Sequence, residues 1–183
     1  MGGSMQRKEQ GFTLIELMIS IAIFAIMATM AAPSFSDMML SQNLNKSTQD
    51  LILTLNEARS QAVIKRTSVE IYLAPVNKNY QDIVAEALKP DPQKKQPRLN
   101  EKTLFIWKPE GKAQLKTGLP ISLLFDFNGG VCISDSASQP KCLRPLDQNT
   151  DVFQICNKLG GTKSKTVSLS RMGTIQQITE GTC

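Results

Sequence analysis

Hydrophobic residues follow three successive patterns along this chain, and the first is a continuous apolar run. Residues 17–36 contain no charged side chain. Twenty residues of α-helix span roughly 30 Å, the thickness of the hydrocarbon core of a bilayer. The run therefore predicts a membrane-spanning helix. However, Glu16 lies at its beginning, and an ionisable group inside a bilayer costs roughly 2.5–3.5 kcal/mol.

The second pattern is an apolar stripe at helical spacing. Its members recur every three or four residues: Leu40, Leu44, Ser47, Leu51, Leu55, Ala58 and Ala62. A stripe of this kind is one face of an amphipathic helix. We therefore expect one helix from about residue 12 to about residue 66, roughly 80 Å long, with its second half against a sheet. Pro33 removes one backbone hydrogen bond from this helix and predicts a kink.

The third pattern is the alternation of apolar and polar residues that is typical of strands. It predicts strands at 67–73, 103–108, 121–127, 131–134, 152–156, 166–170 and 174–178, and the Asn128-Gly129 pair predicts a tight hairpin. The three patterns together predict an α+β protein. Its long N-terminal helix, transmembrane in the first half and amphipathic in the second, packs on a mainly antiparallel β-sheet head.

One segment of the head, residues 89–98 (KPDPQKKQPR), is rich in proline and basic residues. This composition predicts a loop without regular structure. The loop is either a solvated insertion, as most such runs are, or a contact for DNA phosphates or an acidic partner.

Composition argues against an enzyme. The chain has no histidine, so it lacks the commonest general base and the commonest transition-metal ligand. It also shows no paired metal ligands and no glycine-rich phosphate loop. We therefore expect no catalytic residues, no metal and no cofactor. The net charge of +5 is milder than a dedicated nucleic-acid binder usually carries.

The four cysteines indicate an oxidising compartment. They are widely spaced, even in number and without a CxxC pair, which favours two disulfides over a zinc site. Three pairings are open, and we favour Cys132 with Cys142 and Cys156 with Cys183. Arg7 and Lys8 precede the apolar run, which predicts a cytoplasmic N-terminus and an exported head. The two inferences agree.

The leader has the wrong order for a secretory signal, because Gly11 precedes the apolar run and no small-residue cleavage site follows it. The stretch GFTLIEL at residues 11–17, after a basic leader, resembles the class III signal of type IV pilins and type II secretion pseudopilins. The resemblance implies that a prepilin peptidase cuts between Gly11 and Phe12 and methylates Phe12. Natively the leader starts at either Met1 or Met5, since residues 1–4 also resemble an added tag.

The same resemblance gives Glu16 a purpose. In that family the equivalent glutamate is thought to pair with the N-terminal amine of a neighbouring subunit, and a buried charge is least costly when it is paired. Glu16 is then an assembly residue; the alternative is a passive carboxylate that reaches the membrane surface. Pro33 is either an ordinary kink or a helix break that accompanies filament packing.

The resemblance implies the type IV pilin fold and four segments: a cleaved cytoplasmic leader (1–11), a transmembrane and assembly half of the helix (12–36), its amphipathic half (37–66) and a periplasmic head (67–183). It implies a single-pass inner-membrane protein before assembly and a pilus subunit afterwards. The expected partners are the prepilin peptidase, other minor pilins and the major pilin.

Further stretches resemble the GspH/FimT branch of this family, namely residues 51–66, the turn near Phe127 and residues 170–176. The branch leaves three functions open. We favour a FimU-like minor pilin near the pilus tip that helps to prime assembly. The alternatives are a FimT-like DNA-binding minor pilin for natural transformation and a GspH-like minor pseudopilin of type II secretion. The resemblance does not favour DNA, because FimT-type DNA binders carry a C-terminal GRxR motif and the corresponding stretch here, residues 173–177, contains no arginine. The candidates for a weaker DNA contact are Lys158, Lys163, Lys165 and Arg171.

Overall fold

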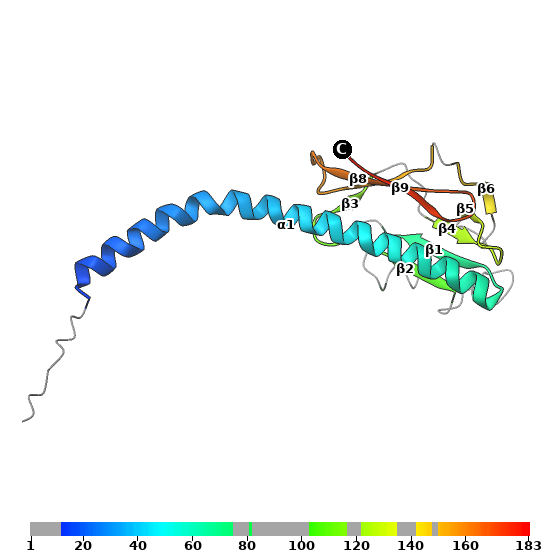
Figure 1. Ribbon diagram of the computed structural model, residues 1–183, viewed down its shortest axis with the longest axis horizontal. Helices are drawn as coiled ribbons and strands as arrows, with labels where there is room; N and C mark the ends of the chain where they lie inside the picture. Colours follow the sequence, from blue (N-terminus) through cyan, green and yellow to red (C-terminus); the bar gives the residue numbers. More distant parts are fainter. Residues whose placement is uncertain (1–11, 75–80, 82–102, 117–121, 135–141, 148–149) are drawn as a thin grey trace, which may run out of the picture. The chain divides into compact units, whose positions relative to one another are not determined.

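The computed structural model describes residues 12–74, 81, 103–116, 122–134, 142–147 and 150–183, without the side chains of residues 30–34. The chain divides into two compact units, Met1–Met39 and Leu40–Cys183. One helix, α1 (Leu14–Lys65), contributes to both units, and the strands all belong to the second (Figure 1). The proline-rich segment 89–98 lies outside the described residues.

In the second unit, α1 buries the stripe that the sequence predicts. All seven positions from Leu40 to Ala62 are at most 9% exposed, and Ser47, Leu51, Leu55, Ala58 and Ala62 are fully buried. The helix ends at Lys65 because Arg66 takes a left-handed conformation, with φ of 49°. The amide of Thr67 then donates to the carbonyl of Ala62 at 3.2 Å, which satisfies a carbonyl of the last turn.

Five strands form the first sheet, in the order β2-β1-β4-β5-β6. Their bounds are β1 Val69–Leu73, β2 Leu104–Trp107, β4 Ser122–Phe125, β5 Val131–Ser134 and β6 Cys142–Pro145. Neighbours pair antiparallel except β1 and β2, which are parallel with Ile71 opposite Phe105. Alternate residues of these strands, such as Ile71, Leu123 and Phe125, join the stripe of α1 in one hydrophobic core.

Four strands form the second sheet, in the order β3-β7-β8-β9, and all of its pairs are antiparallel. Their bounds are β3 Gln114–Leu115, β7 Phe153–Cys156, β8 Ser164–Leu169 and β9 Ile175–Gly181. Phe153, Ile155, Val167 and Leu169 belong to the same core. The protein is therefore α+β, with an N-terminal helix packed on mainly antiparallel sheets as in the pilin fold.

The serine in the apolar stripe has a structural role that the spacing did not indicate. The indole nitrogen Nε1 of Trp107 donates to the carbonyl oxygen of Ser47 at 3.2 Å, and the amide of Glu110 donates to its hydroxyl at 2.8 Å. Through these two hydrogen bonds, Ser47 attaches the end of β2 and the turn that follows it to α1. A larger apolar residue at this buried position would leave the amide of Glu110 without its acceptor.

Two turns meet at one end of the sheets. Between β4 and β5, the carboxylate of Asp126 accepts the amides of Asn128 and Gly130 at 2.8 Å each, which confirms a hairpin around Asn128-Gly129. Between β8 and β9, Gly173 has φ of 69°, and a Cβ there would lie 2.8 Å from the carbonyl oxygen of Gly129. Only glycine allows this approach.

Candidate functional site

The candidate assembly segment is residues 12–36, which contain the first part of α1. Thr13 determines where this helix begins. The amide of Leu17 donates to the carbonyl of Thr13 at 3.2 Å, and the amide of Glu16 donates to the Thr13 hydroxyl at 3.3 Å. Thr13 is therefore the N-cap and Glu16 is the third helical residue, the positions of the Thr-x-x-Glu capping pattern. The residues Thr13 and Glu16 carry this signal in the sequence, three positions apart.

This position gives the carboxylate of Glu16 a local stabilisation. The first turn of a helix carries unpaired amides and a partial positive charge, which favour an anion by about 0.3–1 kcal/mol. That gain is smaller than the cost of placing a carboxylate in lipid. Helix capping alone therefore does not account for Glu16 if the segment enters a membrane.

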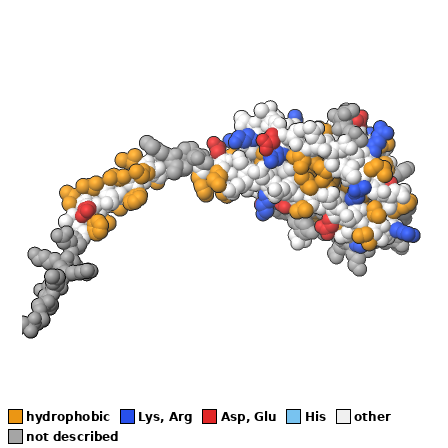
Figure 2. Space-filling model, viewed as in Figure 1, with side chains coloured by type: hydrophobic (Ala, Val, Ile, Leu, Met, Phe, Trp, Pro, Cys, Tyr) orange, Lys and Arg blue, Asp and Glu red, His pale blue; other side chains and the backbone are white. Residues whose placement is uncertain are grey.

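Exposed hydrophobic side chains cover the first part of α1, and Figure 2 shows them on one face of it. The described side chains from Phe12 to Met27 include these exposed hydrophobic residues, 49–82% accessible: Phe12, Leu14, Ile15, Leu17, Met18, Ile19, Ile21, Ile23, Phe24, Ile26 and Met27. A helix that is hydrophobic all round is normally covered by lipid or by other protein, and an exposed patch of this kind marks an interaction site.

The few polar side chains of the segment are satisfied within the helix itself. The hydroxyl of Ser20 donates to the carbonyl of Glu16, and that of Thr29 donates to the carbonyl of Ile26, both at 2.7 Å. These groups need no water. Glu16 differs, because no described residue pairs with its carboxylate.

The cleavage point, the expected membrane span and Pro33 all lie at or near the N-terminal half of α1. Gly11, at the expected cleavage point, lies outside the described residues, and Phe12 directly follows it in an exposed position. No helix in the described part of the chain is long and apolar enough to cross a membrane, so the span expected at 12–36 is not confirmed. The helix continues through Pro33, and the kink there stays a prediction.

Both disulfides have the pairing that the sequence analysis favoured. Cys132 of β5 is joined to Cys142 of β6, with Cα atoms 5.6 Å apart. Cys156 at the end of β7 is joined to Cys183, which follows β9, at 5.9 Å. The first bond closes a hairpin at the edge of one sheet, and the second ties the segment after β9 to the other sheet.

The four candidate DNA contacts do not gather at one place. Lys158, Lys163 and Lys165 lie at the beginning of β8 or just before it, whereas Arg171 follows its end. Six strand residues separate these two ends by roughly 20 Å. The ammonium of Lys165 also pairs with the carboxylate of Glu180 at 3.3 Å. In the described part of the chain, no three acidic or cysteine side chains are placed to hold a metal ion.

Comparison with known proteins gives one finding. The model of the prokaryotic N-terminal methylation motif matches residues 6–32. No curated protein and no solved structure matches the chain. The motif supports a type IV pilin-like protein, of the kind that a prepilin peptidase processes and that assembles with other pilins. It coincides with the capped, apolar, glutamate-bearing start of α1.

Proposed function

We propose that this protein is a minor pilin of the GspH/FimT branch, FimU-like, incorporated near the tip of a type IV pilus to help prime its assembly. One observation carries the pilin-like part of the proposal: a helix segment that is apolar all round, with a lone carboxylate in its first turn, coincides with the methylation motif. The same helix continues into a disulfide-tied head. A structural subunit needs these parts and no catalytic site.

The proposed mechanism begins with processing. A prepilin peptidase removes residues 1–11 and methylates Phe12, which creates a positively charged amine two residues before the helix. The segment from Phe12 onward is held in the inner membrane until the subunit enters the filament. There its apolar surface exchanges lipid for the helices of neighbouring subunits, and the carboxylate of Glu16 pairs with a neighbour's N-terminal amine.

DNA uptake and type II secretion are the two competing functions. The positions of the four basic residues do not favour DNA, because phosphate contacts need cations along a track and Arg171 lies far from the lysines. A secretion pseudopilin would carry the same N-terminal motif. The choice of the pilus rests on the two disulfides that tie the C-terminal end, a pattern that resembles FimU-like minor pilins more than secretion pseudopilins.

The test is deletion of the gene, followed by shearing of the cells and immunoblotting of the major pilin. We expect strong loss of surface pili that the wild-type gene restores. A Gly11→Val variant, which blocks cleavage, should not restore them. Gln6→Val makes a similar change within the leader, away from the cleavage point, and should restore them fully. Normal piliation in the deletion strain would refute the priming function; transformation frequency and secretion would then be measured.

A further inference from the structure

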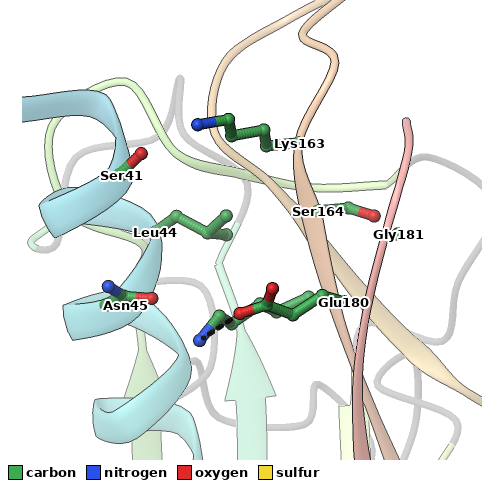
Figure 3. Close-up of a pocket in the computed structure, with 8 residues that line it drawn as sticks. Ser41, Leu44, Asn45, Lys163, Ser164, Glu180 and Gly181 are labelled. Carbon is green, nitrogen blue, oxygen red and sulfur yellow. Dashed lines mark ion pairs between the residues drawn. The ribbon is translucent and has the colours of Figure 1, made fainter. Parts of the chain in front are cut away.

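A small pocket lies in the second unit, where α1 faces the beginning of β8 and the end of β9 (Figure 3). Its volume is about 270 Å³. The described residues that line it are Ser41, Leu44, Asn45, Lys163, Ser164, Lys165, Glu180 and Gly181. Ligand pockets usually measure about 300–1,000 Å³, so this one suits a group the size of a single side chain.

The pocket offers positive charge and neutral hydrogen-bonding groups together. Lys163 makes no ion pair with any described residue, and Figure 3 shows its ammonium extended toward the helix, on the side of Ser41. Across the pocket, the hydroxyl of Ser41 and the amide of Asn45 come from consecutive turns of α1. With Lys165 and Glu180 included, the lining carries one net positive charge.

The ion pair between Lys165 and Glu180 at the pocket wall is weak enough for Lys165 to bind a second carboxylate. Lys165 is well covered, with its side chain 23% exposed, whereas that of Glu180 is 81% exposed. An exposed pair with a single 3.3 Å contact contributes little, on the order of 0–1 kcal/mol. A second carboxylate that enters from outside can therefore share Lys165 and reach Lys163 at small cost.

We propose that this pocket binds the carboxylate of an acidic side chain on a neighbouring pilin subunit, a partner that rests on the proposed function. The one net positive charge of the pocket and its donors on opposite walls favour a small anion. A charge-assisted hydrogen bond to a carboxylate is about twice as strong as a neutral one. The binding would fix the orientation of one head against the next.

A nucleic-acid phosphate fits these observations less well. The exposed carboxylate of Glu180 stands at the pocket and repels a chain of phosphates, and Arg171 is at the far end of β8. A single acidic side chain brings only one negative charge near Glu180, and it can enter the pocket on the side of Lys163, where this repulsion is avoided. The pocket therefore favours a protein ligand.

The direct test titrates isotope-labelled full-length protein in detergent micelles with N-acetylglutamate methylamide and follows the amide signals of Asn45, Ser164 and Gly181 by NMR. We expect saturable shifts at these residues and none with the isosteric N-acetylglutamine methylamide. Lys163→Gln should weaken binding at least five-fold. Lys158→Gln removes a nearby exposed lysine outside the pocket and should leave the affinity unchanged.

Three results would overturn the proposal: no saturable shift, equal shifts with the glutamine analogue, or unchanged binding by Lys163→Gln. Tighter, salt-dependent binding of a single-stranded oligonucleotide at the same signals would replace the protein ligand by nucleic acid. Measuring pili in the deletion strain distinguishes failure of the pocket proposal from failure of the proposed function. If pili depend on the gene but the pocket binds nothing, only the pocket is wrong; if the pocket binds but pili do not depend on the gene, the pilin partner is wrong.

Discussion

Glu16 can act in two ways, on the start of its own helix and on a neighbouring subunit, and one substitution alone would not separate them. Its carboxylate is stabilised by the first turn of α1, which Thr13 caps, and it is also the residue that we propose pairs with a neighbour's amine. The first effect concerns the helix alone, whereas the second appears only in the filament. Substitutions that keep one property and remove the other distinguish them.

We predict that Glu16→Gln sharply lowers incorporation into sheared pili, by ten-fold or more, while membrane insertion stays normal. Glutamine keeps the size of the side chain and suits the third helical position, but it carries no charge. Thr13→Ala removes the cap, at a cost of about 1 kcal/mol, and keeps the charge, so it should be incorporated nearly normally. Immunoblots of the pilus and membrane fractions give the measurement. Equal incorporation of Glu16→Gln and wild type would contradict the assembly role.

Asp151 is a second residue whose charge matters, in this case for stability. The guanidinium of Arg144 donates to both of its carboxylate oxygens, at 2.5 and 2.6 Å, and the amide of Asp147 donates at 2.9 Å. The residue is only 4% exposed. These bonds, the one to Arg144 above all, lower the pKa of Asp151. They connect β6 of the first sheet to the segment that enters β7.

We predict that Asp151→Asn lowers the free energy of unfolding by about 1.5–3 kcal/mol at pH 7. Because the folded state lowers the pKa, the contribution is complete above the ordinary carboxyl range and disappears as the pH falls through the lowered value. The difference in melting temperature between wild type and variant should therefore shrink below about pH 4. Melting curves from pH 7 to 2.5 measure it, with the exposed Glu57→Gln as control. A difference that does not depend on pH would contradict the ionic explanation.

Among the elements, α1 shows most clearly how far the sequence determines the fold. The seven-position stripe was predicted and is buried, because helical spacing depends only on local geometry. Even the end of the helix was placed within one residue. Seven strands were also located, with ends that differ by up to three residues.

What the sequence did not show depends on pairing between distant segments. Strand β3 has two residues, too few for a detectable alternation, and β6 (CLRP) ends in a proline that argues against a strand. The parallel pair β1–β2 also went unpredicted, as did the division into two sheets. A parallel pair needs a long connection, and the chain between Leu73 and Leu104 is long enough, but length alone does not choose the partner.

The contact between α1 and the end of β2 gives a prediction at this scale. Ser47→Ala removes the acceptor of the Glu110 amide, and we expect a loss of about 1 kcal/mol. Ser60→Ala makes the same change at an exposed position of α1 and should have almost no effect. The fluorescence of Trp107, the single tryptophan and 2% exposed, reports unfolding directly. A Ser47→Ala protein as stable as Ser60→Ala would show that water replaces the hydroxyl.

For the whole molecule, the two disulfides close loops of different length. They join residues 10 and 27 positions apart, and chain entropy gives about 2.7 and about 3.5 kcal/mol respectively. We predict that the Cys156→Ser/Cys183→Ser double variant melts at a lower temperature than Cys132→Ser/Cys142→Ser. Thermal unfolding under non-reducing conditions compares them. The reverse order would mean that the edge hairpin β5–β6 depends more on its bond than the C-terminal segment does.

The bond between Cys156 and Cys183 also has a consequence for biosynthesis. Cys156 can form its disulfide only after the chain has been synthesised as far as Cys183. Until then it carries a free thiol, at a time when β7 still lacks the covalent tie to the segment after β9. A nascent or truncated subunit is therefore chemically different from a finished one. The thiol of Cys156 is therefore a chemical mark of an unfinished chain.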